Sequence, residues 1–509
     1  MAGTNALIPQ TPVTAQGIVP GWPAYGISLA LWENGQSMEA NEVAKKCLIP
    51  LLSILSICGA LNVAMAARLQ PSDLTYLGAF LLPTTPFFEA MGEMGYPQTS
   101  GMTFNPDGNG GKGSLFIIGR GGRVAEINTP RPKLSSLKTA TVLQKNPDPF
   151  SYGAYGENDA TAGIAYMTAR GSQTSPKLYF GSFEYYNVDG TDYNSLGWAN
   201  TTLTDPQTAG LWHVGPRAGD NLDDWNHGVK SGEYLIATPQ AWADQHTNGR
   251  SLLIGRMREA AGAGGSSGPV LLATAPWRSG NPPAPGTALP ATPLMYFYTN
   301  ITVPSGTSTK WQSWRMNNDP DWSYWSPMDR CTGGAWIDRN GRSALVLGLR
   351  HGTFKNDPIQ PKYGRNGAHG GFKDDPSGRT PAYCYGDASQ CLATSNNNYR
   401  GYSAGPYVAR LAFVDIADLE AVAAGSKDPR TVIAYNVYNL MNDFGKPAGT
   451  RQDRTDGNDV IGIAYNEKTG RLYVGQANGN DPNGHPNPAW PVIHVYRINR
   501  SDSSHSAQP

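Results

Sequence analysis

An arginine and a histidine follow the apolar run Leu345–Leu349 directly, in the order Arg350-His351-Gly352. A histidine can transfer protons near neutral pH, and an adjacent guanidinium can hold a substrate carboxylate. We therefore expect His351 to act as a proton-transfer group and Arg350 to bind a carboxylate. The alternative interpretation is a strand-end pair that bonds the carbonyl groups of neighbouring loops.

A second pair of charged residues, Asp329-Arg330, ends a tryptophan-rich segment that includes Trp325. A carboxylate and a guanidinium side by side can bind or protonate a sugar, and an indole ring can stack on its apolar face. These residue types predict a substrate-binding role for Trp325, Asp329 and Arg330. Ion pairs that only hold the loop in place are the competing interpretation.

Two further candidates for proton transfer are His227 and Tyr385. His227 follows Asp223, Asp224 and Asn226, and this set could also ligate a metal ion, although adjacent aspartates are typical of a solvated turn. A tyrosine such as Tyr385 can serve as general acid or base where a lyase removes a proton beside a uronic carboxylate.

The sequence leaves the cofactor open. It contains no P-loop, no H-E-x-x-H and no C-x-x-C pattern. The Asp/Asn/Gly-rich stretches 453–459 and 478–487 could bind a structural calcium ion, but neither has EF-hand spacing. Ordinary turn chemistry explains both stretches equally well.

Aromatic residues are frequent, with 25 Tyr and 13 Trp. Many lie on three long segments between β-rich runs, Phe183–Leu211, Ser305–Cys331 and Gly352–Pro406. We interpret these segments as loops that gather on one face of the fold, where rings can stack on sugars while Asn, Asp and Arg bond the hydroxyl groups. Filling of internal interfaces is the alternative role for the rings.

The elements that must position these residues repeat along the chain. Gly462–Gly475 is an apolar run, a polar turn and a second apolar run, and variants occur at Gly101–Gly119, Gly163–Gly181, Gly228–Gly255 and Gly334–Gly348. Each phrase predicts an antiparallel hairpin, and its recurrence predicts an all-β fold, a β-propeller. Five phrases give five blades, and six or seven blades follow if some copies have diverged.

One propeller domain is expected over residues 67–498. The early run Tyr76–Leu82 and the last run Val492–Ile498 are the natural pair to close the ring. Helical patterns are expected only at Pro239–His246 and Ile416–Ala424. The polar residues 499–509 are predicted to form a disordered tail.

The composition excludes some partners. The chain of 509 residues has 40 basic and 40 acidic residues and a formal net charge of zero, which gives no electrostatic footprint for nucleic acid. Charged residues make up 16%, below the roughly 25% of an average domain. The 60 Gly and 40 Pro residues, beside many aromatics, indicate frequent turns between strands.

An apolar segment follows Lys45 and Lys46 and ends in Ala64-Met65-Ala66. A basic start, a short apolar core and an A-x-A end are typical of a secretory signal peptide, which we assign to residues 45–66. The core is too short and interrupted for a membrane span, so no stable membrane insertion is expected after cleavage. A retained membrane anchor is the alternative.

Cleavage after Ala66 predicts a secreted or periplasmic protein. Residues 1–44 then form an extra N-terminal segment, which indicates a start codon assigned too far upstream, with Met38 as the true start, or a cytoplasmic tail. Export permits disulfides, and Cys384 and Cys391 are close enough in sequence to close a small loop. Cys331 is left unpaired in that scheme.

Several phrases in one order resemble a family of secreted bacterial proteins known only as hypothetical. They are Asp73–Phe80, Val124–Ile127, Trp242–Glu259, Ala275–Trp277, Tyr324–Pro327, Cys384–Gly386 and Pro491–Tyr496. The resemblance spans residues 70–498 and implies a propeller and export, but transfers no catalytic residue. A more distant likeness, of architecture alone, is to propeller polysaccharide lyases such as the ulvan and oligogalacturonate lyases.

These features predict a secreted propeller that acts on or binds carbohydrate, most concretely a lyase or hydrolase of an acidic polysaccharide. The alternative is a non-catalytic propeller that binds a glycan or a protein at the cell surface or in the periplasm. The enzymatic hypothesis requires His227, Arg350, His351 and Tyr385 to converge on one site.

Overall fold

The computed structural model divides the chain into two units, Met1–Ala64 and Met65–Pro509. The described residues all belong to the second unit. They are residues 66–89, 101–150, 160–183, 193–217, 227–228, 231–256, 270–296, 299–301, 311–313, 330–352, 372–373, 382–383, 407–450, 459–480 and 490–499. The predicted signal peptide and residues 1–44 therefore lie outside the described part, apart from Ala66.

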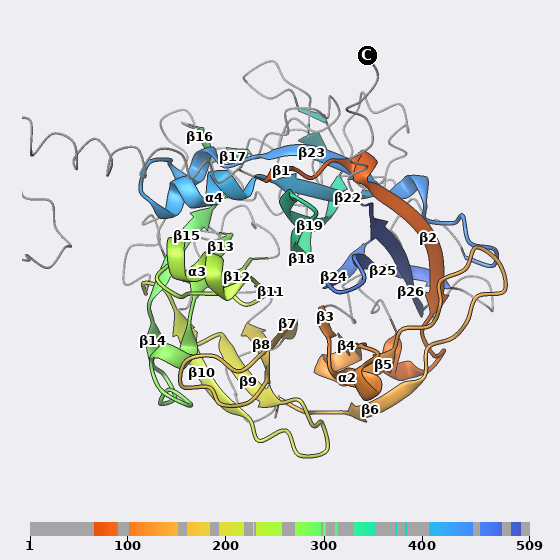
Figure 1. The fold of residues 1–509 in the computed structure, drawn as a ribbon, viewed down its shortest axis with the longest axis horizontal. Helices are drawn as coiled ribbons and strands as arrows, with labels where there is room; N and C mark the ends of the chain where they lie inside the picture. Colours follow the sequence, from red (N-terminus) through yellow and green to blue (C-terminus); the bar gives the residue numbers. More distant parts are fainter. Residues whose placement is uncertain are drawn as a thin grey trace, which may run out of the picture. The chain divides into compact units, whose positions relative to one another are not determined.

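Five sheets of four or more strands surround one axis (Figure 1), which confirms the β-propeller and its five blades. Blade 1 contains β3 (Met102–Asn105), β4 (Ser114–Ile118), β5 (Val124–Asn128) and β6 (Val142–Asn146). Blade 2 contains β7 (Ala160–Met167), β8 (Lys177–Phe183), β9 (Leu196–Asn200), β10 (Ala209–Val214) and β14 (Ala288–Leu289).

The remaining blades follow in chain order. Blade 3 contains β11 (Tyr234–Ala237), β12 (Leu252–Gly255), β13 (Leu271–Thr274) and β15 (Ala291–Met295). Blade 4 contains β18 (Arg330–Arg339), β19 (Arg342–Gly352), β22 (Tyr407–Val414) and β23 (Ala434–Asn439), with β1 (Ala67–Arg68) beside β19. Blade 5 contains β24 (Val460–Asn466), β25 (Arg471–Asn480), β26 (Trp490–Ile498) and β2 (Leu74–Leu81). Each of the five repeated phrases forms the inner hairpin of one blade, as predicted.

Blade 5 is built from both ends of the domain. β2 pairs antiparallel with β26, with Tyr76 opposite Tyr496 and Phe80 opposite Ile493. The predicted pairing of the early and last runs is therefore confirmed. The ring therefore closes through backbone hydrogen bonds within one sheet, because the early strand β2 supplies the outer strand of the blade that the last three strands begin.

The innermost strands β3, β7, β11, β18 and β24 surround the axis (Figure 1). The glycines at their starts lie against one another, so we call the end of the ring where these strands begin the leading end. Their backbones approach closely there, because a glycine replaces a side chain in each phrase. Gly163 has a φ of 67°, and a Cβ atom added to it would lie 2.7 Å from Cα of Tyr234 in the next blade. Gly462 has a φ of 155°, and its added Cβ would lie 2.8 Å from the backbone nitrogen of Met102.

The core lies between the blades. Five apolar clusters each combine side chains from two neighbouring blades, and most of their members are fully buried. The two predicted helices are observed as α3 (Gln240–His246) and α4 (Ile416–Ala423), and both contribute side chains to the core between blades 3 and 4. α4 is capped by Asp415, whose side chain accepts from the N–H of Ala417 at 3.0 Å. Trp242 on α3 contacts Trp336 at 4.4 Å between ring centroids and thereby joins blades 3 and 4.

Part of one predicted loop is strand. The segment Phe183–Leu211 contains β9 and the start of β10, and Trp198 lies buried between Tyr179 and Ala209 in the sheet. That prediction was wrong for these residues because β9 is only five residues long and polar sequence flanks it. In the other two segments the described residues include the short strands β17 (Trp311–Ser313), β20 (Phe372–Lys373) and β21 (Ala382–Tyr383).

Candidate functional site at the leading end

Two buried arginines share one carboxylate at the leading end. Arg330 on β18 and Arg350 on β19 lie directly opposite each other in the antiparallel register. Asp459 precedes β24, and its carboxylate oxygens lie 3.1 and 3.2 Å from Nε and Nη1 of Arg350 and 3.6 Å from Nη1 of Arg330. The three residues are 4%, 5% and 1% exposed. Asp459 therefore offsets the repulsion between two guanidinium groups and ties blade 5 to blade 4.

Two more buried arginines lie at the same end. Arg410 pairs with Leu349 in the register, so it faces the opposite side of blade 4 from Arg350. Arg256 follows β12 directly and is fully buried. Buried arginine is rare in proteins. The described charged side chains buried at this end are thus four arginines and two carboxylates, Asp459 and Glu233.

His227 belongs to the blade 3 part of this end. Its side chain is fully buried, and Nδ1 lies 3.2 Å from Nη2 of Arg256, which also donates to the carbonyl oxygen of His227 at 2.8 Å. A guanidinium can only donate, so Nδ1 must accept, and the proton of the neutral ring lies on Nε2. This arrangement suits His227 to donate a hydrogen bond through Nε2 rather than to accept a proton there.

Cys331 follows Arg330 in the sequence, and its side chain contacts that of Tyr234. Burial raises the pKa of Cys331 to about 12, and burial also raises the pKa of Tyr234 well above its ordinary value. The hydroxyl of Tyr234 donates to the carbonyl oxygen of Val270. A thiol that stays protonated is a poor nucleophile, so Cys331 is a packing residue.

The sequence-predicted residues divide among several places. The structure brings Arg330 and Arg350 together, and it places His227 with Arg256 in blade 3. His351 lies on β19 opposite Val408. The other predicted residues, Trp325, Asp329, Tyr385, Cys384 and Cys391, lie outside the described part of the chain. Convergence of the four proposed enzymatic residues therefore stays a prediction.

Sequence reasoning missed the partners Asp459 and Arg256. Asp459 ends the polar stretch 453–459 and directly precedes the phrase that begins β24. Arg330 holds the corresponding place at the start of β18. Comparison of the residues that precede each repeated phrase would have indicated opposite charges on neighbouring inner strands.

Metal and membrane features can be judged only for the described residues. Within them, no group of three or more His, Cys, Asp or Glu side chains could hold a metal ion. The stretches considered for calcium or another metal lie mostly outside that part. None of the described helices has the length and apolar character that crossing a bilayer requires.

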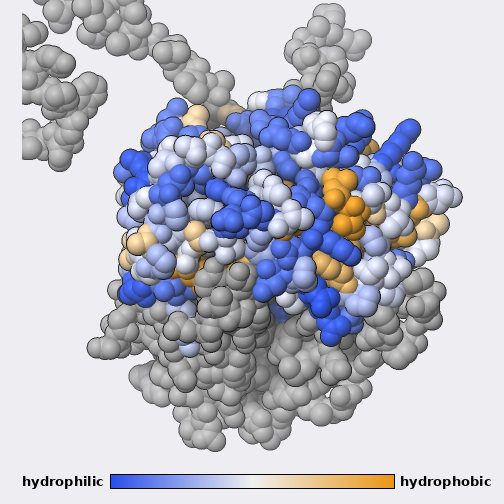
Figure 2. Space-filling model, turned by 90° about the horizontal axis from the view of Figure 1, so that it is seen from below, coloured by the Kyte–Doolittle hydropathy of each residue, from blue (hydrophilic) through white to orange (hydrophobic). Residues whose placement is uncertain are grey.

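The described outer surface is largely polar. Figure 2 shows mainly hydrophilic residues on one side of the ring, with small hydrophobic areas among them. Among the described residues, the exposed large hydrophobic side chains are Leu134, at 54%, and Leu143, at 39%. Two scattered leucines do not make a docking surface. The buried charges of the leading end are therefore the more informative feature.

The fold and the leading end define a five-bladed propeller with four buried arginines at the leading end of blades 3 and 4. No protein-family model and no curated protein matches the sequence. Among solved structures, the chain is similar to a member of the DUF4221 family from Bacteroides vulgatus, with a TM-score of 0.31, 8% identity and coverage of 83% of this chain and 98% of that chain. It is also similar to the C-terminal WD40 domain of Sif2, with a TM-score of 0.25, 9% identity and coverage of 85% and 99%. At such scores the fold assignment rests on the strand pairing itself.

Proposed function

We propose that this propeller is an exported protein that binds an acidic polysaccharide at its leading end and cleaves it as a lyase or hydrolase. The observation that carries the proposal is the pair Arg330 and Arg350, held side by side by Asp459. Guanidinium groups recognise carboxylates through paired N–H donors, which suits the uronate units of such a polymer.

A lyase reaction would use the same groups. An arginine neutralises the uronate carboxylate, a base removes the proton from the adjacent carbon, the C–O bond to the leaving sugar breaks, and an acid protonates the leaving oxygen. His351 and Tyr385 are the proposed base and acid. The proton on Nε2 of His227 assigns that residue to hydrogen bonding in this scheme.

A non-catalytic propeller that binds a glycan or a protein is the second candidate. The burial of Arg330 and Arg350 favours it, because side chains that are 4% and 5% exposed and paired with Asp459 contribute to structure as well as to charge. In that case the leading end attracts an anionic partner without reacting with it.

The test compares polygalacturonate and alginate with neutral dextran. Binding is measured by affinity electrophoresis, and reaction by the ultraviolet absorbance of an unsaturated product and by released reducing ends. Arg350→Gln should weaken binding about tenfold or more, since a hydrogen bond to a charged group contributes about 1.5–3 kcal/mol. Arg342→Gln is the matched control, because Arg342 begins the same strand and pairs with Asp73 at the other end.

The outcomes separate the two candidates. Unsaturated product or reducing ends support the enzyme. Binding without either product supports the non-catalytic propeller. If neither acidic polymer binds better than dextran, or if both variants bind equally, the proposal for the leading end is wrong. Thermal unfolding of both variants shows whether each remains folded.

A further inference from the structure

In each blade, the connection between the third and fourth strands reaches the outer strand of the preceding blade. The connection from β5 to β6 in blade 1 lies beside β2 of blade 5, where the backbone nitrogen of Lys133 donates to the carbonyl oxygen of Ala79 at 3.0 Å. The connection from β9 to β10 in blade 2 contacts β6, where the carbonyl oxygen of Leu203 accepts from the side chain of Asn146 at 2.6 Å. These connections therefore join neighbouring blades.

Blades 3 and 4 repeat this arrangement. The connection from β13 to β15 contains β14, which pairs with β10 of blade 2, with His213 opposite Ala288. The connection from β22 to β23 contains α4, which contacts β15 of blade 3. In the same connection the carbonyl oxygen of Pro429 accepts from the backbone nitrogen of Tyr296, directly after β15, at 3.2 Å. All four connections are attached at both ends to strands of their own blade.

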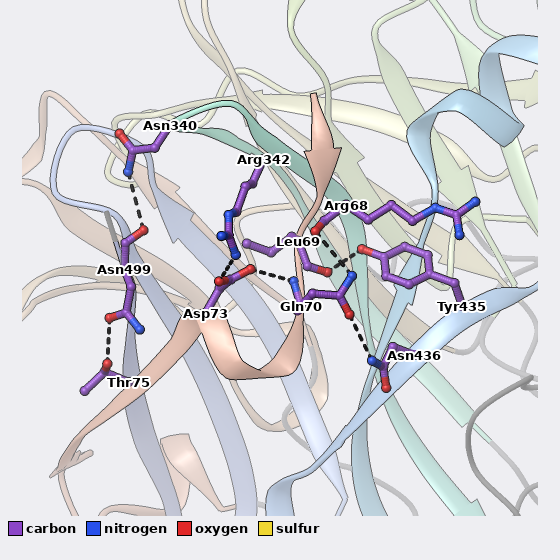
Figure 3. Close-up of polar contacts among 10 residues, drawn as sticks. All are labelled: Arg68, Leu69, Gln70, Asp73, Thr75, Asn340, Arg342, Tyr435, Asn436 and Asn499. Carbon is purple, nitrogen blue, oxygen red and sulfur yellow. Dashed lines mark hydrogen bonds and ion pairs between the residues drawn. The ribbon is translucent and has the colours of Figure 1, made fainter. Parts of the chain in front are cut away.

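Blade 5 differs, because its third strand β26 and its fourth strand β2 come from opposite ends of the domain. Residues 67–73, which we call the closing strap, take the place of the connection and contact β23, the outer strand of blade 4 (Figure 3). The carbonyl oxygen of Leu69 accepts from the hydroxyl of Tyr435 at 2.5 Å. The side chain of Asn436 donates to that of Gln70 at 3.1 Å.

The closing strap is bonded to the residue that follows β26, but it is not continuous with it. The backbone nitrogen of Asn499 donates to the carbonyl oxygen of Asp73 at 2.8 Å. The side chain of Asn340 donates to the carbonyl oxygen of Asn499 at 3.5 Å, and Asp73 forms an ion pair with Arg342 (Figure 3). The join between blades 4 and 5 thus depends on noncovalent bonds where the other four joins have a continuous connection.

We propose that the propeller opens at the join between blades 4 and 5 and that the closing strap is the element whose release begins this opening. In the other joins a connection that loses its hydrogen bonds stays tethered at both ends, so it rebinds from a high effective concentration. The strap is tethered to blade 5 through β2 alone. Its release uncovers β23 and allows β2 to leave β26, a local opening that costs less than global unfolding.

The candidate site lies across the same join. Asp459 of blade 5 pairs with Arg330 and Arg350 of blade 4 at the leading end. The strap pairs with Arg342, at the other end of β19. Opening of the whole join separates Asp459 from both guanidinium groups, so the strap controls whether this carboxylate stays in place. The coupling is a property of the protein without ligand and does not rest on the proposed function.

Native-state hydrogen exchange, followed by mass spectrometry on the full chain, tests the order of opening. Peptides from the closing strap, β2 and β23 should exchange about tenfold faster or more than peptides from β10 and β14, after correction for intrinsic rates. These two strands are the matched comparison, because β14 covers β10 within a continuous connection. Equal or slower exchange of the strap and β2 would overturn the proposal.

Three variants test whether the join opens as one unit. Tyr435→Phe removes one hydroxyl and keeps the ring, and should accelerate exchange of the strap and β2 about fivefold, the effect of one hydrogen bond. Asp459→Asn, at the leading end of the same join, should accelerate the same peptides. Asn146→Ala is the control, because it removes a side-chain bond to Leu203 at the join between blades 1 and 2. It should leave the strap and β2 unchanged.

Two results with these variants contradict the proposal. If Asp459→Asn accelerates β18, β19 and β24 but not β2, the two ends of the join open separately. If Asn146→Ala accelerates β2 as much as Tyr435→Phe does, the exchange reports global unfolding. Since no ligand is present in these measurements, they stand or fall apart from the binding of an acidic polysaccharide.

Discussion

The hydroxyl of Tyr76 lies 2.8 Å from Nδ1 of His494, across a sequence separation of 418 residues. This contact joins the first long strand of the domain to the last. Nε2 of the same ring lies 2.9 Å from Oε1 of Gln476. Both nitrogens therefore have partners within blade 5, and the fully buried ring is held in its neutral form.

The first prediction concerns acid stability. Burial lowers the pKa of His494 to about 3. The unfolded chain binds a proton on this ring below its ordinary pKa of about 6.5, so stability is complete above that pH and falls as the pH drops toward 3, by up to about 1.4 kcal/mol per unit. Urea unfolding should show a loss between pH 7 and 5 that is about 2 kcal/mol larger for the native protein than for His494→Gln. Parallel curves for the two proteins would contradict the assignment.

The second prediction separates two costs of replacing a glycine: the clash of the added Cβ atom with a neighbouring strand, and the strain of a positive φ. Gly163 and Gly341 have φ values of 67° and 72°, so alanine is equally strained at both. An added Cβ at Gly163 would lie 2.8 Å from the carbonyl oxygen of Gly232, whereas at Gly341 nothing lies within 4 Å. Gly163→Ala should therefore lower the free energy of unfolding by about 2 kcal/mol more than Gly341→Ala. Chemical denaturation of both variants measures the difference, and equal losses would mean that the inner strands move apart freely.

The third prediction concerns the carboxylate between the arginines. Asp459→Asn leaves Arg330 and Arg350 opposite each other without their shared anion, and should lower the free energy of unfolding by about 3 kcal/mol. Asp418→Asn is the control, because Asp418 pairs with Lys427 at 2.5 Å where both side chains are about a quarter exposed. That change should cost less than about 1 kcal/mol. Similar losses for both variants would show that the buried cluster contributes no more than a surface pair.

The fourth prediction concerns which cysteine thiols react with an alkylating reagent. Cys331 is a free and buried thiol, and its raised pKa keeps it protonated. In the protein that begins at Ala67, iodoacetamide should label no cysteine under native conditions at pH 8. After denaturation without reductant it should label Cys331 alone, because Cys384 and Cys391 are predicted to be joined. Peptide mass spectrometry reads the sites, and labelling of Cys384 or Cys391 before reduction would disprove the disulfide.

The propeller could be predicted because the inner hairpin of each blade has a recognisable pattern in the local sequence. The inner hairpins are apolar, close on glycine and repeat, so five phrases marked five blades. The outer strands lack this pattern. β6 alternates between half-buried and exposed residues, and β9 is five residues in polar surroundings, so neither run stands out from a loop.

The site was predictable only in part. Arg330 and Arg350 stand beside other charged residues at strand ends, and that local pattern indicated anion binding. Their partner Asp459 lies 109 residues from Arg350, and the contact exists only because the inner strands of blades 4 and 5 begin side by side. A contact set by the packing of two neighbouring blades cannot be predicted from local spacing.

The pairing of β2 with β26 has a consequence for synthesis. β2 leaves the ribosome more than 400 residues before its partner β26. The ring therefore cannot close until β26 has been synthesised, and β2 lacks that partner until then. Contacts of such long sequence separation slow folding, so this protein should depend on chaperones that shield the waiting strand.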